Sequence, residues 1–105
     1  MNSQLKKTII TERRKKMLFM AINEYDSENK DAMSERFNEK GLMLPEGVKE
    51  IGLWSQVTGA RTFGVFETDD PAALVKFANE WNDLGVMEMI PIMDSREVKK
   101  IVTGG

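Results

Sequence analysis

The sequence predicts an α+β fold in which a four-stranded antiparallel sheet carries two helices on one face. Three observations support this prediction. The run Met17–Ile22 is apolar on both side-chain parities, which is typical of a strand covered on both faces. An amphipathic stripe extends from Ala73 to Trp81, and two alternating segments flank Thr58-Gly59 as in a hairpin.

The predicted domain consists of four strands and two helices. In chain order they are a strand over 17–25, a helix over 30–40, strands over 48–57 and 61–68, a helix over 71–81 and a strand over 86–93. Gly41 supplies the stop of the first helix, and an acidic cap before Pro71 begins the second. Between them, Pro45 and Gly47 occupy positions i+1 and i+3 of a predicted type I turn.

Two details of the strands and ends are also predicted. Gly64 lies in a strand interior, where glycine weakens the strand, so we expect it to mark a bulge or the close approach of another group. After the last strand, Asp94-Ser95 caps a short helix whose apolar residues are expected to pack back on the domain. These residues are Val98, Ile101 and Val102.

Length, composition and charge limit the class of protein. The chain has 105 residues, of which 30 % are charged and 41 % are hydrophobic, and its net charge is −2 at pH 7. No apolar run approaches the ~20 residues of a membrane-spanning helix, and the first 16 residues lack a signal-peptide core. We therefore expect a cytoplasmic protein without membrane contact. Residues 1–16 are expected to form a flexible extension, and residues 17–105 a single domain.

The chain contains neither cysteine nor histidine. Disulfides, thiolate catalysis and cysteine-bound metal sites are therefore excluded, as is the commonest general base. Acidic residues form no clustered loop for Mg²⁺ or Ca²⁺, so no metal and no cofactor are expected. The basic run Arg13–Lys16 could tether nucleic acid or a membrane, but such a run is more often a solvated arm. Basic residues are otherwise dispersed, which does not favour nucleic-acid binding.

The predicted order of elements is that of the ferredoxin-like split βαβ fold, with both helices on one face of the sheet. Right-handed crossovers place its first and third strands centrally. The helices leave the other face uncovered, although the first and fourth strands are apolar on both parities. An exposed apolar patch of that size usually marks an interface. We therefore expect a homodimer through the helix-free face of the sheet.

Five segments of the chain are distinctive. They are Met17–Met20, Gly41–Gly47, Trp54, Phe66–Pro71 and Trp81–Leu84. In these segments the sequence resembles a family of short, functionally uncharacterised bacterial and archaeal proteins. Its members look like the dimeric α/β-barrel superfamily, which includes small monooxygenases, muconolactone-isomerase-like proteins and stress-response barrels. The resemblance implies a dimeric α/β-barrel that begins near Met17, and it implies no catalytic residue.

Glu88 is the candidate catalytic residue, because it interrupts an apolar strand between Met87 and Met89. On one interpretation it faces a wet sheet edge or pairs with a basic residue. On the other interpretation it lies in a barrel pocket, where it could act as an acid or a base. The sequence leaves both interpretations open.

Trp54, Arg61 and Glu67 join Glu88 as candidate binding residues. Arg61 follows the hairpin tip and could bind a carboxylate or phosphate, although an isolated arginine beside a turn is more often solvated. Glu67 is expected to belong to the acidic cap of the second helix. Trp54 could line a ligand cavity or could simply pack in the core.

Two classes of function follow. The first is a small-molecule-binding or cofactor-less enzymatic barrel, with a pocket between sheet and helices for a small apolar or aromatic acid. The second is a non-catalytic dimeric module with a regulatory or structural role. A pocket of at least ~300 Å³ with convergent polar groups would favour the first class, and a filled interior would favour the second.

Overall fold

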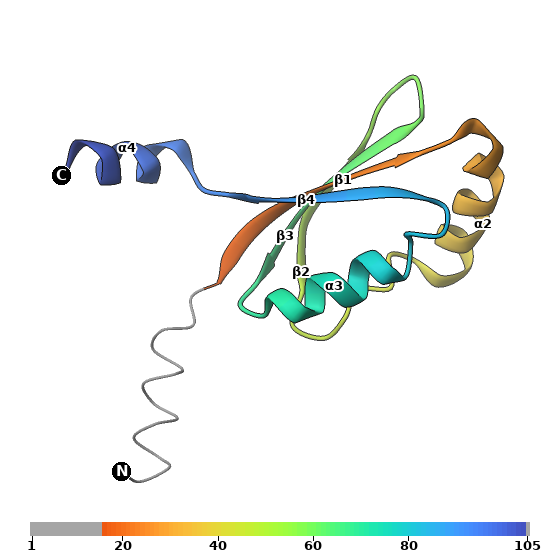
Figure 1. Ribbon diagram of the computed structural model, residues 1–105, viewed down its shortest axis with the longest axis horizontal. Helices are drawn as coiled ribbons and strands as arrows, with labels where there is room; N and C mark the ends of the chain where they lie inside the picture. The colour runs from red at the N-terminus through yellow and green to blue at the C-terminus, as the bar shows by residue number, and fades with distance from the viewer. Residues whose placement is uncertain (1–15, 105) are drawn as a thin grey trace, which may run out of the picture.

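A four-stranded antiparallel sheet organises residues 16–104, the part of the chain that the computed structural model describes (Figure 1). Its strands lie in the order β2-β3-β1-β4. The strands are β1 (Met17–Tyr25), β2 (Lys49–Ser55), β3 (Arg61–Thr68) and β4 (Gly85–Ile92). The helices are α2 (Lys30–Lys40), α3 (Pro71–Asn79) and α4 (Ser95–Thr103), with a short 3-10 helix η1 (Ser27–Asn29) before α2. The predicted α+β class is confirmed, whereas the predicted flexible extension lies outside the described residues, Lys16 excepted.

The central strand β1 divides its side chains between two different environments. Phe19, Ala21 and Asn23 are buried on the face that α2 and α3 cover. The alternate residues Leu18 and Met20, with Ile22, are half-buried on the other face. We call these the covered face and the open face of the sheet. One parity of the apolar run is therefore buried under the helices, as its pattern predicted, whereas the other is only half-buried.

The core lies between the covered face and the two helices. Phe66 of β3 and Phe77 of α3 meet edge to face, with ring centroids 5.1 Å apart. The stripe of α3 buries Ala73, Leu74 and Phe77 as its spacing predicted, and Trp81 is buried just beyond the helix. Because this core draws on a strand and a helix together, it fixes the position of α3 on the sheet.

An ion pair, which we call the Arg36–Asp83 clamp, joins α2 to the segment after α3. Both guanidinium nitrogens of Arg36 donate to the Asp83 carboxylate at 2.7 Å, and one also donates to the Glu80 carbonyl at 2.9 Å. The guanidinium lies 5.7 Å from the Trp81 ring centroid. In turn Trp81 Nε1 donates to the Leu42 carbonyl at 3.0 Å. The clamp and the Trp81 hydrogen bond therefore join α2 and the segment that follows it to the end of α3, and the two helices form one roof over the sheet.

Two local predictions are decided by the structure. Gly64 marks the close approach of another group and not a bulge, since an added Cβ would lie only 2.5 Å from the Phe66 ring. The irregularity of the sheet lies in β2, between Glu50 and Gly52. The turn after α2 lies one residue later than predicted, since Val48 N–H donates to the Pro45 carbonyl at 3.2 Å. Gly47 then sits at i+2 with φ 89°, which type II turns require.

Helix α4 forms where predicted but does not pack back on the domain. Asp94 caps it by accepting from Arg96 N–H at 2.7 Å, and all nine of its residues are exposed. Figure 1 shows α4 beyond the end of the sheet, away from α2 and α3. Only Met93 and Asp94 separate it from β4, and this short connection directs the helix outward.

Candidate functional site

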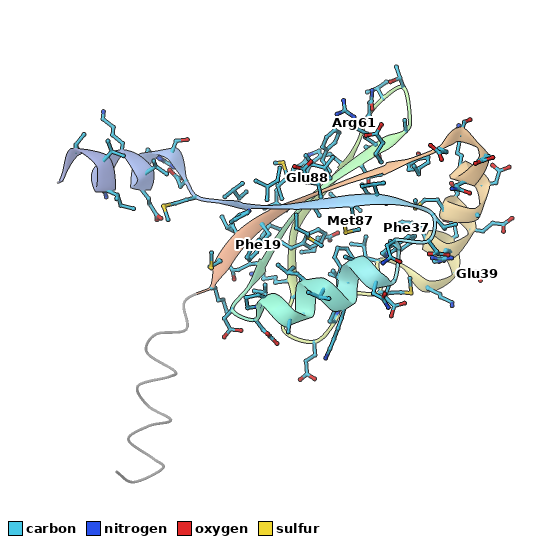
Figure 2. All side chains as sticks on the ribbon, in the orientation of Figure 1. Phe19, Phe37, Glu39, Arg61, Met87 and Glu88 are labelled. Atoms are coloured by element: carbon cyan, nitrogen blue, oxygen red, sulfur yellow. The ribbon has the colours of Figure 1, made fainter. Side chains whose placement is uncertain are left out.

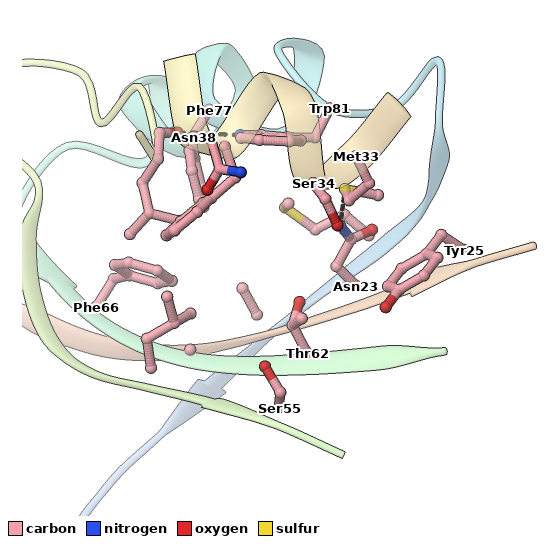
Figure 3. Close-up of a pocket in the computed structure, with 16 residues that line it drawn as sticks. Asn23, Tyr25, Met33, Ser34, Asn38, Ser55, Thr62, Phe66, Phe77 and Trp81 are labelled. Atoms are coloured by element: carbon pink, nitrogen blue, oxygen red, sulfur yellow. Dashed lines mark hydrogen bonds between the residues drawn. The ribbon is translucent and has the colours of Figure 1, made fainter. Parts of the chain in front are cut away.

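A cavity of about 350 Å³ lies between the covered face and the two helices (Figure 3). Helix α2 contributes Met33, Ser34 and Phe37, and α3 contributes Phe77. All four strands supply its floor, for example through Ala21 of β1. The volume lies within the ~300–1,000 Å³ range of small-molecule sites in proteins.

The walls of the cavity are mostly apolar and aromatic. Phe66, Phe77 and Trp81 surround one end, and Gly64 beneath them has no side chain, which leaves space for the Phe66 ring. Phe37 of α2 and Leu53 of the edge strand β2 also line the cavity, although both are partly exposed. Because Phe37 on α2 and Leu53 on β2 both line the cavity and reach the surface, the cavity opens between α2 and β2.

A set of uncharged polar side chains faces the same space, as Figure 3 shows. They are Asn23, Tyr25, Ser34, Asn38, Ser55 and Thr62. No described residue that lines the cavity carries a full charge. The site therefore offers hydrogen-bond donors and acceptors without a counter-ion.

Asn23 is the polar residue of this set that lies deepest, with only 6 % of its surface exposed. Its Nδ2 donates to the Met33 sulfur at 3.7 Å, and its Oδ1 has no hydrogen-bond partner among the described residues. A thioether is a weak acceptor, and a buried carbonyl oxygen without a partner costs about 1–3 kcal/mol. The fold thus tolerates a buried amide that is poorly satisfied by the protein itself.

The four residues singled out from the sequence lie elsewhere, on the open face. Strand register places Glu88 beside Ile22, which also pairs with Phe63, and Phe63 pairs with Trp54. Figure 2 shows Glu88 and Arg61 on the side of the sheet opposite α3, and Met87 on the side facing it. None of the four lines the cavity. They share one face of the sheet but form no common polar site among the described residues.

Each of these candidates has its own surroundings. Trp54 is 56 % exposed and lies over Gly52. Arg61 Nε donates to Gln56 Oε1 at 3.2 Å, and its guanidinium lies 5.5 Å from the Phe63 ring centroid. Glu88 is exposed, and no ion pair to it occurs within residues 16–104.

Glu67 does not belong to the cap of α3, contrary to expectation. Its carboxylate lies on the open face, 3.7 Å from Lys16 Nζ, the last residue of the basic run. The cap instead uses Asp70, which accepts from Ala72 N–H at 3.0 Å, with support from Thr68 Oγ1. The alternation of β3 explains the difference, because Thr68 faces the helices and Glu67 therefore does not.

Sequence reasoning missed the polar lining of the cavity. One signal was present, since Asn23 continues the parity of Phe19 and Ala21 and must enter the same buried layer. A polar residue on a buried parity indicates a site or an internal hydrogen bond. The remaining polar groups come from α2, β2 and β3, so their convergence depends on tertiary packing.

The geometry defines a small α+β domain with an uncharged cavity under two helices. Residues 17–105 match the family described as "Domain of unknown function (DUF3303)", and the chain belongs to this family. No curated protein and no solved structure matches the chain. Within the described residues, no helix is long and apolar enough to cross a membrane, and no acidic cluster could hold a metal.

Proposed function

We propose that this protein binds a small, uncharged, largely apolar molecule in the cavity between the sheet and helices α2 and α3. The observation that carries the proposal is the combination of volume and lining. A space of about 350 Å³ combines aromatic walls with several polar side chains that converge on it. A core that served stability alone would be filled, because interiors pack to the density of organic crystals.

The lining favours an uncharged ligand over the small acid expected from the sequence. A carboxylate buried here would find no lysine or arginine among the described lining residues. Taking an ionised group from water without a partner is strongly unfavourable. The uncharged hydroxyl and amide groups of Thr62, Ser34 and Asn38 suit instead an alcohol, amide or ketone with an apolar body.

The same lining supports binding rather than catalysis. Tyr25 is the one described residue of the lining with an ionisable side chain, and the candidate base Glu88 lies on the opposite face. General acid–base chemistry needs a titratable group within hydrogen-bond reach of the substrate. The proposed role is therefore that of a binding protein, regulatory or carrier, for a neutral ligand.

Tryptophan fluorescence offers a direct test, because the two tryptophans lie in different places. Trp81 lines the cavity, whereas Trp54 is exposed on the open face. The Trp54→Phe variant therefore reports on the cavity alone. Titration with uncharged aromatic and aliphatic alcohols, amides and ketones should change the Trp81 emission. Each matched carboxylic acid at pH 7 should bind at least about tenfold more weakly, a difference of about 1.4 kcal/mol.

A blocked cavity provides the specificity control. Ser34→Phe in the Trp54→Phe background places a ring from α2 into the space and should abolish the response. Glu35→Phe adds the same ring at the next position, which does not line the cavity, and should leave binding unchanged. An unchanged response in Ser34→Phe, or no response to any neutral compound, would contradict cavity binding.

We also propose that the domain is a ferredoxin-like dimeric α/β-barrel over residues 17–105, in which each copy covers the open face of its partner. The element order and the central position of β1 and β3 support it. Support also comes from the open face, where Leu18, Met20 and Ile22 lie beside Val65 and Ile90. Sedimentation at low micromolar concentration should give twice the chain mass of 11.9 kDa. A stable 11.9 kDa species would overturn the dimer and leave the cavity proposal intact.

A further inference from the structure

The C-terminal helix α4 carries an apolar stripe that its own domain does not cover. Val98, Ile101 and Val102 recur at three- and four-residue spacing, so they share one side of the helix. All three are exposed, and Val102 is 78 % exposed. Met93, just before the helix, is exposed as well.

A helix of this length requires a packing partner. Isolated helices shorter than about 12–15 residues are marginal in water, so most helical stability in proteins comes from burying an apolar side. Helix α4 has nine residues, with a cap at Asp94 and a left-handed C-cap at Gly104. Caps alone do not replace the missing burial, so a surface outside its own domain has to receive the stripe.

The direction of α4 determines which surfaces it can reach. It follows β4 after only two residues, and Asp94 fixes its first turn through hydrogen bonds to Arg96 and Glu97. Figure 1 shows the helix continuing past the end of β4, away from the cavity and its roof. A nine-residue helix extends about 14 Å. It therefore projects beyond the end of its own sheet, where its apolar stripe stays exposed.

The charges of the two surfaces are complementary. Helix α4 has three basic residues, Arg96, Lys99 and Lys100, and one acidic residue, Glu97. On the open face, β1 and β4 present two carboxylates, Glu24 and Glu88, and no basic side chain. An apolar stripe with basic neighbours thus matches an apolar half-sheet with acidic ones. Arg61 of β3 lies opposite Glu24 in the strand register, so Glu88 is the carboxylate of this half that remains for the basic residues of α4.

We propose that α4 is an exchanged arm: in a homodimer, each α4 lies across the β1/β4 half of the partner's open face. The inference rests on the proposed dimer and adds to it a specific contact. Val98, Ile101 and Val102 cover Leu18, Met20 and Ile90 of the other copy, and the basic residues of α4 approach Glu88. When two copies exchange their α4 helices about a two-fold axis, the apolar stripe of each helix and the open face of each sheet become buried together.

Two valines provide a matched test in the full chain. Val102 on α4 and Val75 on α3 are 78 % and 71 % exposed, so they are equivalent in an isolated protomer. Val102→Glu should raise the dimer dissociation constant at least tenfold, because it places a carboxylate in the contact and next to Glu88. Val75→Glu should change that constant less than twofold. Equal constants for the two variants would overturn the exchanged arm.

Cross-linking identifies the surface that α4 covers, and the chain has no cysteine of its own to interfere. In the Met20→Cys/Val102→Cys variant, a short bismaleimide should join two chains into a product of twice 11.9 kDa. Met20→Cys/Val75→Cys should not. A link within one chain, or none, would overturn the arm. The dimer itself is judged separately by wild-type sedimentation. A wild-type dimer whose dissociation constant is raised no more by Val102→Glu than by Val75→Glu refutes the arm alone, whereas a wild-type monomer refutes both.

Discussion

The covered and open faces of the sheet are built from the same strands and have opposite characters. On the covered face, buried aromatic residues surround a cavity whose polar groups are all uncharged. On the open face, half-buried aliphatic residues surround isolated charges such as Glu88 and Arg61, which lie on different strands. A charged residue in an apolar strand is a natural candidate for a functional site, but here the cavity lies on the opposite face of the sheet from these charges. The comparison shows that the position of a residue in the alternation of its strand, more than its chemical type, decides whether its side chain reaches the cavity.

The largest effect is expected from truncating the same residue type on the two faces of β3. Phe66 is 1 % exposed and packs on Phe77, whereas Phe63 is half-buried on the open face. Phe66→Ala should lower the free energy of unfolding by about 3–5 kcal/mol, the usual range for a buried phenylalanine. Phe63→Ala should lower it by less than half as much in a monomer. Urea titration measures both.

The concentration dependence of the Phe63→Ala effect sharpens the comparison. If two copies cover their open faces, Phe63 becomes buried and its truncation costs more at high protein concentration. Phe66→Ala should show no such dependence beyond that of the wild type. Equal destabilisation by the two variants at every concentration would contradict the difference between the faces.

A second prediction compares two glycines, one on each face. A Cβ at Gly64 would meet the ring of Phe66, and a Cβ at Gly52 would meet the ring of Trp54. Phe66 is buried and cannot move aside, so Gly64→Ala should destabilise by about 1–3 kcal/mol, as overpacking does. Trp54 is exposed and can swing into solvent, so Gly52→Ala should stay within about 0.5 kcal/mol of the wild type.

Tryptophan fluorescence and urea unfolding of the same variants distinguish a displaced Trp54 side chain from an overpacked core. Gly52→Ala should shift the emission of Trp54 without altering the unfolding midpoint in urea. Gly64→Ala should lower that midpoint. It should also narrow the cavity, because Gly64 and Phe66 both line it. A destabilised Gly52→Ala would mean that Trp54 is held in place, for instance by a second copy of the chain.

Much of the fold could be predicted from local patterns, because those patterns reflect burial on one face at a time. The six-residue apolar run of β1, the cap before Pro71 and the stop at Gly41 each specify one element through short-range chemistry. The central place of β1 followed from its two apolar parities. The short C-terminal helix also formed where its cap indicated, although its packing did not follow.

The candidate site could be predicted only in part, because it is assembled from residues distant in sequence. Ser34 and Phe77 approach one space through the packing of two helices, which no spacing encodes. Glu88 was correctly identified as exceptional in its strand, but its parity opposes that of Met87, which faces the cavity. Counting parity from Asn23 across the strand pairs would have pointed to the covered face. Sequence alone supplies the parity of each strand, and the register between strands completes the site.

The smallest effect concerns the roof of the covered face, which the Arg36–Asp83 clamp fastens. The hydrogen bond from Arg36 holds the pKa of the Asp83 carboxyl below its usual value. The folded-state pKa is therefore lower than the unfolded one, about 3.9, so the pair stabilises the fold above that pH. This contribution is lost as the pH falls through the folded-state pKa. Asp83→Asn should then be less stable than the wild type at pH 7, and this difference should shrink as the pH is lowered toward 2.

Asp94 provides the control, because Arg96 lowers the pKa of its carboxyl in the same way. That pair, however, joins the N-cap of α4 to a residue of its first turn and reaches no element of the roof. Asp94→Asn should therefore leave both the urea midpoint of the domain and ligand binding by Trp81 fluorescence unchanged at either pH. Asp83→Asn should weaken ligand binding at pH 7, since α2 is less firmly held over the cavity. A stability difference between wild type and Asp83→Asn that persists undiminished at pH 2 would show that the clamp acts through packing of Arg36 on Trp81 rather than through charge.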